Sequence, residues 1–418
     1  MLLKIVTRSL WNRRMTAAMT VFTLAISLTL LFSIEHIRKQ AKESFTSSVS
    51  GVDLIVGARS GQLNLLLYSV FRVGNPTNNI SWDTYQHIRQ HQQIAWTVPI
   101  SLGDSHRGYR VIGTTQDYFT HFKYADSRAL QFREGRQFDG LFDVVLGAEV
   151  ARALDYSLGD EIVISHGMGS TSFMHHDNLP FVVTGILEPT GTPVDKSLHV
   201  SLEAIEAIHV GWQHGAPTPG REISAEEAQQ RDLTPEQITA FMVGMKSRVA
   251  SFAVQRQVNN YRQEPLSAIL PGVALGELWQ MLGTVERLLM LISYLVLFAA
   301  FAGLVTMLLA SMKERQREIA VLRAAGARPW QVFVLIQIEV VILTLCAVVV
   351  ALIAMLLSTT LSQEYLANRF GVLISNQVLD PELLPVIGSV CVVAVVVACV
   401  PAFSAYRQAL STTLSHKS

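Results

Sequence analysis

Four long apolar runs limit what this chain can fold into more than any other feature of its sequence. They cover residues 16–34, 288–310, 332–358 and 384–403. Each is long enough to cross a lipid bilayer as a helix, which takes about 20 predominantly apolar residues. Only 16% of the 418 residues are charged, against about a quarter in soluble proteins. The first run is followed by the charged residues 35–43 without a small-residue cleavage site, so we predict that it is a retained membrane helix and not a signal peptide.

Basic residues near the ends of the runs predict the orientation of the chain. Lys and Arg gather before the first run, between the second and third, and after the fourth, whereas the loop 359–383 has only Arg369. Cytoplasmic flanks carry such an excess of positive charge. The parts predicted to be cytoplasmic are residues 1–15, which read as an amphipathic surface helix, 311–331 and 404–418. The long region 35–287 and the loop 359–383 then lie outside.

The region 35–287 mixes period-two apolar segments with helical ones, separated by Gly, Pro and Asp. Both of its ends keep a helical pattern. We therefore predict an α-helical membrane protein with four transmembrane helices and a large mixed α+β extracytoplasmic domain on a helical stalk. The domain is predicted to have two lobes, residues 49–130 plus 238–272 and residues 131–237, with 211–236 a polar loop.

The expected elements of this domain follow from those patterns. The predicted strands cover 52–56, 95–102, 109–115, 143–146, 161–165, 181–187, 239–246 and 266–270, and the predicted helices cover 63–71, 82–91, 148–154, 202–209 and 248–257. The apolar segment 63–71 is interpreted as a core helix, with an apolar binding groove as the alternative.

No motif of a nucleotide-binding or hydrolytic enzyme occurs in the sequence. It has no GxxxxGK[ST] loop, GxSxG, HExxH or CxxC. The three cysteines, Cys346, Cys391 and Cys399, all fall within apolar runs. A formal net charge of zero gives no argument for nucleic acid as a partner. We predict that the chain is not an enzyme and holds no cofactor, so that any ATP is hydrolysed by another subunit.

Histidines in the outer region raise the question of a metal site, because imidazole and carboxylate suit Zn²⁺ or Cu²⁺. The outer histidines considered are His166, His175, His176, His199, His209 and His214. The pair His175 and His176 beside Asp177 is the metal candidate, although its spacing fits no named site and solvated loop histidines are the favoured interpretation. His87 and His91 stand four residues apart on a predicted helix and form a weaker candidate.

The segment 311–331, SMKERQREIAVLRAAGARPWQ, is short and rich in charge and lies between two apolar runs. Its charges alternate in sign and its apolar residues share one side. Gly326 suits the end of a helix and Pro329 the first turn of the next one. We interpret the segment as a brief amphipathic helix on the membrane surface that receives force from a soluble partner.

Glu339 lies about two turns inside the third run, where a carboxylate is costly and rarely faces lipid. We expect it to hydrogen-bond across helices or to a second copy of the chain. Proton translocation is the less favoured alternative, because no second carboxylate is evident within the apolar runs.

The layout and several motifs resemble the permease subunits of the MacB/FtsX/LolC-like ABC transporters. The residues that carry the resemblance are Glu314-Arg315-x-x-Glu318-Ile319, Arg323-Ala324-x-Gly326-Ala327 and Glu339, and more weakly Pro401-Ala402, Ala405 and Arg407, with Leu158-Gly159-Asp160 and Phe181-Val182-Val183-x-Gly185-Ile186-Leu187 outside. The sequence departs from the family's pattern after Arg407, where QALSTTLS follows in place of a frequent Pro.

The resemblance implies a bacterial inner-membrane protein with periplasmic and cytoplasmic parts. Two permeases, identical or different, would pair with a cytoplasmic ABC ATPase dimer that binds ATP and Mg²⁺. The residues implied in ATPase coupling are Lys313, Glu314, Arg315, Glu318, Ile319, Arg323 and Gly326. ATP-driven movement would then cross the membrane to the outer domain, which the family calls mechanotransmission. The runs themselves offer almost no polar lining for a solute path.

The cargo implied by the resemblance is a lipoprotein, a peptide or something similar, with membrane lipid and a periplasmic protein or lipoprotein as further partners. Two alternatives remain open. In the first, the outer domain is a regulatory scaffold that activates a cell-wall hydrolase. In the second, the histidines of the outer region serve a metal-linked transporter.

Overall fold

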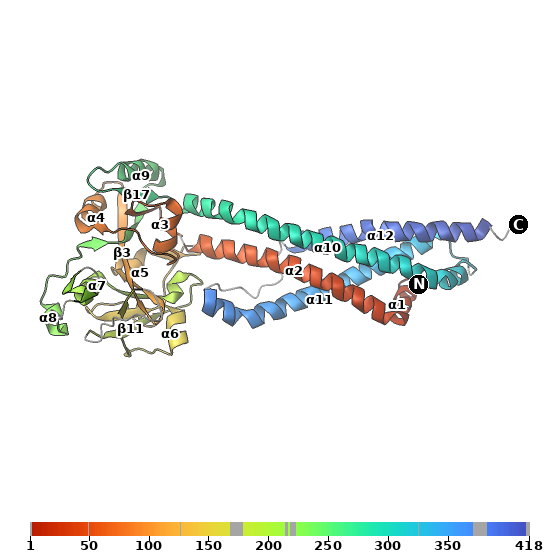
Figure 1. Cartoon of the computed structure of the whole chain (residues 1–418), viewed down its shortest axis with the longest axis horizontal. Helices are drawn as coiled ribbons and strands as arrows, with labels where there is room; N and C mark the ends of the chain where they lie inside the picture. Colours follow the sequence, from red (N-terminus) through yellow and green to blue (C-terminus); the bar gives the residue numbers. More distant parts are fainter. Residues whose placement is uncertain are drawn as a thin grey trace. The chain divides into compact units, whose positions relative to one another are not determined.

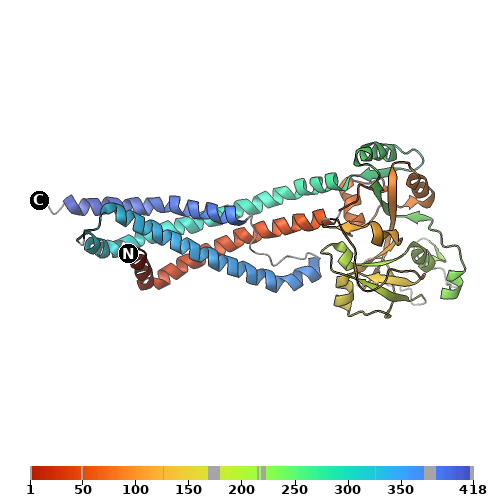
Figure 2. The same cartoon turned by 180° about the vertical axis from the view of Figure 1, so that it is seen from behind.

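The computed structural model describes residues 2–48, 50–125, 127–167, 179–213, 216–217, 223–324, 326–370 and 383–414. It divides into two compact units (Figures 1 and 2). The membrane unit consists of Met1–Gln40, Gly283–Glu364 and Ile374–Ser418, and the outer domain of Ala41–Leu282 with Tyr365–Leu373.

Long helices build the membrane unit. They are α1 (Leu2–Asn12), α2 (Arg14–Ser47), α10 (Pro271–Ala324), α11 (Pro329–Phe370) and α12 (Leu383–Leu414). In the described part of the chain, four of them are long and apolar enough to cross a membrane, and each overlaps one of the four apolar runs. A helix satisfies its own backbone hydrogen bonds, which lipid does not, so apolar runs of this length form helices.

Packing among α2, α10, α11 and α12 separates an inner face from a lipid-facing one. Leu28 and Phe32 of α2 and Leu304 of α10 are at most 1% exposed. On α11 and α12 the buried positions include small residues spaced four apart, Ala347 with Ala351 and Ala394 with Ala398. Small side chains let neighbouring helices approach closely, which supplies the packing that the hydrophobic effect does not supply within lipid.

The outer domain is built on one mixed β-sheet, to which eleven strands belong in the described residues. Its main path is β17 (Leu266–Ile269), β1 (Leu54–Ala58), β16 (Ala240–Met245), β3 (Ile94–His106), β4 (Tyr109–Thr114), β12 (Ser197–Ser201), β8 (Asp143–Leu146), β11 (Phe181–Leu187) and β7 (Phe132–Gly135). Two short strands complete it, with β10 (Ser165–His166) on β3 and β9 (Glu161–Ile162) on β11. The remaining strands are β2 (Ile80–Ser81), β5 (Lys123–Tyr124), β6 (Arg128–Ala129), β13 (Trp212–Gln213), β14 (Ala216–Pro217) and β15 (Gln237–Ile238).

The outer domain also contains seven α-helices in the described residues. They are α3 (Gln62–Ser69), α4 (Trp82–Arg89), α5 (Asp117–His121), α6 (Ala148–Leu154), α7 (Leu202–His209), α8 (Ala225–Gln229) and α9 (Ser251–Asn259), with 3-10 turns at Pro193–Lys196 and Arg248–Ala250. Leu65 and Leu66 of α3 are fully buried beside Tyr118 of α5. The apolar segment predicted as a core helix is therefore core and not an exposed groove.

The strands of the two predicted lobes meet at one junction in the sheet. β4 and β12 pair in parallel there, with Val111 opposite Leu198. All strands on the β4 side of the main path come from residues 49–130 and 238–272, and all on the β12 side come from 131–237. The sheet is continuous across the junction, and the division into two lobes stays a prediction.

Local patterning placed many elements correctly but missed others. β8, β11, α6 and α7 have the predicted bounds. The predicted strand 161–165 is two strands, β9 and β10, which pair with different partners. The predicted loop 211–236 contains α8, which begins with a capping box formed by Ser224 and Glu227.

Candidate functional site

The charged segment that follows the second span continues helix α10 as far as Ala324. This differs from the brief separate helix expected from the sequence. The residues from Lys313 to Ala324 include neither Gly nor Pro, and most are good helix formers, so nothing ends the helix that the span has begun. The chain turns only around Gly326, whose φ of +92° is a conformation that glycine adopts without strain. Pro329 then begins α11, as predicted, and the Arg328 amide donates to Gln331 Oε1 at 2.8 Å.

Most of the residues expected to contact an ATPase lie in these last turns of α10. They are Lys313, Glu314, Arg315, Glu318, Ile319 and Arg323. The structure describes the backbone of this stretch but not these side chains, so their role in coupling stays a prediction.

The start of the segment is fixed by its neighbours in the membrane unit. Met312 is 4% exposed and packs with Val332 and Ile336 of α11 and with Ala402 of α12. Arg13, at the junction of α1 and α2, donates from Nη1 to the Ser311 carbonyl at 3.2 Å. Helices α1, α2, α11 and α12 therefore all meet α10 near the end of its membrane-spanning part.

Glu339 is 1% exposed within the helices of the membrane unit. Nearby, Gln337 donates from Nε2 to Cys399 Sγ at 3.4 Å, which joins α11 to α12. The buried carboxylate thus lies among protein groups within a single copy of the chain. What Glu339 does there stays a prediction.

An ion pair links α2 to α10 just beyond the apolar runs, after the run 16–34 and before the run 288–310. Arg38 Nη1 lies 3.4 Å from Glu286 Oε1, and Arg38 also pairs with Glu35 one turn earlier on α2. The side chains of Arg38 and Glu286 are about one third exposed.

Further along, the same two helices are anchored in the outer domain. Ala274, Leu275 and Leu278 of α10 are buried in its main apolar core. The Phe45 ring of α2 packs 4.5 Å from the ring of Phe71 and 5.7 Å from that of Trp279. Both stalk helices therefore contribute side chains to the outer domain.

The predicted metal candidates His175, His176 and Asp177 lie outside the described residues. His199 is fully buried beside the Tyr118 ring. Burial, with a smaller contribution from the charge of Arg72, lowers the pKa of His199 to about 3, so this residue is neutral at neutral pH.

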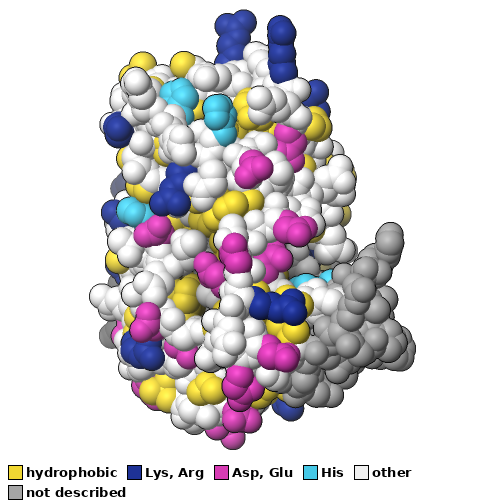
Figure 3. Space-filling view, turned by 90° about the vertical axis from the view of Figure 1, so that its left-hand side faces the viewer, with side chains coloured by type: hydrophobic (Ala, Val, Ile, Leu, Met, Phe, Trp, Pro, Cys, Tyr) yellow, Lys and Arg dark blue, Asp and Glu magenta, His cyan; other side chains and the backbone are white. Residues whose placement is uncertain are grey.

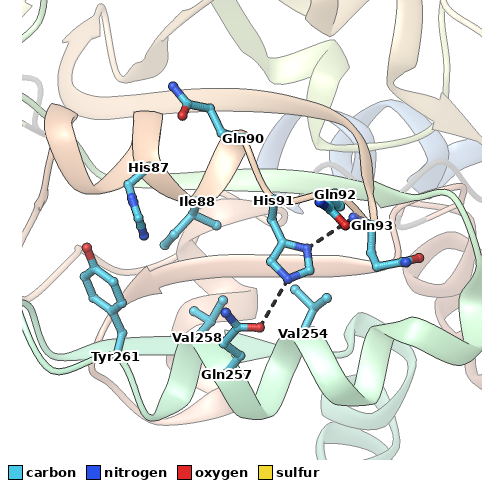
Figure 4. A pocket seen from close by; sticks show the side chains of 10 residues that line it. All are labelled: His87, Ile88, Gln90, His91, Gln92, Gln93, Val254, Gln257, Val258 and Tyr261. Carbon is cyan, nitrogen blue, oxygen red and sulfur yellow. Dashed lines mark hydrogen bonds between the residues drawn. The ribbon is translucent and has the colours of Figure 1, made fainter.

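The weaker candidate pair separates because α4 ends at Arg89, which leaves His91 beyond the helix. Figure 4 shows the pocket of about 460 Å³ between α4 and α9 that His87 and His91 line. His91 Nδ1 accepts from the Gln93 amide at 3.2 Å, so Nε2 donates to Gln257 Oε1 at 3.1 Å. With both ring nitrogens hydrogen-bonded, His91 is not arranged to chelate a metal with His87.

The sequence did not predict a cluster formed by Asp104 of β3, His166 of β10 and His209 of α7, although both histidines are among the outer ones named above. The three residues come from three separate elements, and Asp104 stands 62 positions from His166. No local spacing pattern therefore predicts the cluster. Antiparallel pairing of β10 with β3 sets His166 directly opposite Asp104.

The cluster lies in the wall of a cleft of about 560 Å³. Glu206, Asp232 and Glu236 line the same cleft, which gives it an acidic character. The face of the molecule drawn in Figure 3 likewise gathers Asp and Glu side chains (magenta) over its middle and lower part.

Two models of known protein families match this chain. Residues 17–261 match the model of the MacB-like periplasmic core domain, and residues 290–412 match that of the FtsX-like permease C-terminal region. The chain belongs to the MacB/FtsX-like family of ABC transporter permeases. The fold class predicted from the sequence is confirmed for this MacB/FtsX-like permease, whose described residues form four candidate transmembrane helices and a large mixed domain.

Two solved structures resemble the outer part of this MacB/FtsX-like permease. One is the periplasmic region of MacB from Actinobacillus actinomycetemcomitans, with 11% identity, a TM-score of 0.34, and coverage of 56% of this chain and 97% of that one. The other is the extracellular domain of the noncanonic ABC-type transporter YknZ from Gram-positive bacteria, with 12% identity, a TM-score of 0.30, and coverage of 52% and 98%. A comparison with curated proteins found no match. The family assignment rests on the two family models.

Proposed function

We propose that this permease subunit transmits movement from a separate cytoplasmic ATPase to its outer domain, and that no solute passes through its helices. The observation that carries the proposal is the continuity of α10. This single helix of 54 residues is about 80 Å long at 1.5 Å per residue. Its first turns supply Ala274 and Leu275 to the core of the outer domain, and its last turns hold the charged segment 313–323.

The first turns of α10 are packed into the core of the outer domain. Ala274 and Leu275 are 0% and 4% exposed, in the same core as α3 and β1. Removing a buried Leu side chain from such a core costs about 1.5–3 kcal/mol. Separating the start of α10 from the core would cost this free energy. Movement of α10 is therefore expected to carry the core of the outer domain with it.

Transmission also requires a differential interaction at the cytoplasmic end. The ATPase, with ATP and Mg²⁺ bound, must bind one arrangement of the helices more tightly than the other, because equal affinity shifts no equilibrium. We assign that contact to Lys313, Glu314, Arg315, Glu318, Ile319 and Arg323, followed by the turn at Gly326. In this arrangement the protein lies in a bacterial inner membrane with both termini in the cytoplasm. A second permease pairs with this one. The cargo is a lipoprotein, a peptide or a similar molecule handled at the outer domain.

The test uses the permease co-purified with its ATPase and reconstituted in lipid. In the triple variant Glu314→Ala, Arg315→Ala, Glu318→Ala we expect the stimulation of ATP hydrolysis by the permease to fall about tenfold, as loss of about 1.4 kcal/mol of contact energy predicts. The matched control is Arg8→Ala with Arg14→Ala, which removes exposed charges from α1 and α2. Unchanged stimulation in the triple variant, with insertion and assembly intact, would exclude the assigned contact.

A further inference from the structure

We propose that Asp104, His166 and His209 bind a divalent transition-metal ion, Zn²⁺ by the chemistry of the ligand set, in the wall of the outer-domain cleft. The site is independent of the proposed coupling function. Two imidazoles and a carboxylate are common ligands of Zn²⁺ in proteins. The three residues offer one ligand atom each, and these atoms lie within 4.8 Å of one another.

The separations between the ligand atoms match those around a tetrahedral ion. His166 Nδ1 lies 3.0 Å from Asp104 Oδ1 and 3.1 Å from His209 Nε2, and His209 Nε2 lies 3.5 Å from Asp104 Oδ1. Bonds of 2.0–2.1 Å at tetrahedral angles place two ligand atoms about 3.3 Å apart. These separations are therefore compatible with an ion about 2 Å from all three atoms.

The tautomer of His209 is set as a metal site requires. Its Nδ1 donates to the Ile205 carbonyl one turn earlier in α7, at 2.7 Å. In the neutral ring, Nε2 then carries a lone pair, and this lone pair belongs to the atom nearest to Asp104 and His166. A backbone carbonyl that holds the far nitrogen of a ligating imidazole is the usual outer contact of metal sites.

The charge at the site also favours a cation. The Asp104 side chain is 2% exposed. A carboxylate buried in this way requires a compensating positive charge, and a bound cation supplies it.

Strands and a helix hold the three ligands, and the described residues add no fourth His, Cys, Asp or Glu ligand to the group. Asp104 and His166 face each other across the β3–β10 pair, and His209 ends α7. All three line the cleft, so an ion held between them lies at its wall. Water or a carboxylate of a molecule in the cleft would complete its coordination, as in zinc sites that exchange a ligand.

The three groups could instead share a proton through hydrogen bonds, and the experiment distinguishes a bound metal ion from a shared proton. Full-length protein in detergent is stripped of metal and titrated with Zn²⁺ by calorimetry, and with Co²⁺ by the visible absorption of tetrahedral coordination. We expect one equivalent to bind the wild type, and binding to weaken more than about 100-fold in His166→Ala, because loss of a ligand exceeds the 10–100-fold effect of an outer contact.

Two further variants and two controls make the outcome unambiguous. Asp104→Asn is expected to weaken binding similarly, and His166→Gln guards against misfolding, since the His166 side chain is 37% exposed. The double variants His87→Ala, His91→Ala and His175→Ala, His176→Ala remove other histidines of the outer domain and should bind as the wild type does. Absence of stoichiometric binding by the wild type, or loss of binding only in a control, would overturn the proposal and leave the shared proton as the occupant.

Discussion

Arg38 Nη1 and Glu286 Oε1 lie 3.4 Å apart and connect the two helices that lead from the membrane toward the outer domain. The pair is partly exposed, so it contributes at most about 1 kcal/mol to stability. The pair depends on how the two helices are aligned, because the two charges meet only when α2 and α10 keep one position along their length. An ion pair of this kind can be broken without unfolding either helix.

Reversing the charges tests whether this alignment matters for coupling. We expect Arg38→Glu or Glu286→Arg alone to reduce permease-stimulated ATP hydrolysis, because each places like charges together, and the double reversal to restore much of it. Stability should change by less than about 1 kcal/mol in all three variants. Arg287→Glu, on the same helix turn but exposed, is the matched control. Equal activity of the single and double variants would show that the pair has no part in coupling.

The turn at Gly326 gives a second prediction. Its φ of +92° is strained for any residue with a Cβ atom, at a cost of about 1–2 kcal/mol for left-handed backbone. We expect Gly326→Val to reduce the stimulation of ATP hydrolysis while Gly326→Asn is better tolerated, since Asn accepts left-handed conformations at helix ends. If both variants behave as the wild type does, the turn is not needed to position the segment.

Gly147, just before α6, gives a prediction about folding. A Cβ added there would lie 2.2 Å from the Val194 carbonyl oxygen and 2.5 Å from that of Asp195, both backbone atoms that cannot move aside cheaply. We expect Gly147→Ala to destabilise the outer domain by about 1–3 kcal/mol, as overpacking does, measured as faster hydrogen exchange in β8 and β12. In Gly103→Ala the added Cβ would meet nothing within 4 Å, so this control should exchange more slowly than Gly147→Ala.

His199 predicts how stability depends on pH. Burial, and next the charge of Arg72, lower its pKa from 6.5 to about 3 in the folded protein, where the Tyr118 ring also faces it. The unfolded chain therefore binds this proton more readily than the folded protein does. The contribution of His199 to stability is fully present above about pH 6.5 and is lost as the pH falls from 6.5 toward 3. A shift of this size corresponds to several kcal/mol, at about 1.4 kcal/mol for each unit.

The measurement is the urea midpoint of the full chain in detergent at pH 7 and pH 5, followed by tryptophan fluorescence. His199→Leu should lose a large part of the difference between the two pH values. His87→Leu replaces an exposed histidine of the same domain and should keep the difference. If the midpoints at pH 7 and pH 5 differ by the same amount in the wild type and in His199→Leu, the lowered pKa of His199 is contradicted.

Much of the outer domain was predictable, because short-range patterning decides where strands and helices form. Asp143–Leu146 and Leu202–His209 have the predicted bounds. The strand Ser197–Ser201 escaped prediction, since its polar residues Ser197 and His199 are both fully buried. Only the neighbouring strands β4 and β8, on either side of it, make that burial possible.

The sequence by itself determined the membrane helices and the family, because a helix in lipid satisfies its own backbone and requires only a long apolar run. The tertiary structure alone decided the cluster of Asp104, His166 and His209. Register between β3 and β10 brings Asp104 opposite His166, and α7 delivers His209, 43 positions further along the chain, to within 3.1 Å of His166. Contacts between residues this far apart depend on sheet order and helix packing, which no local spacing encodes.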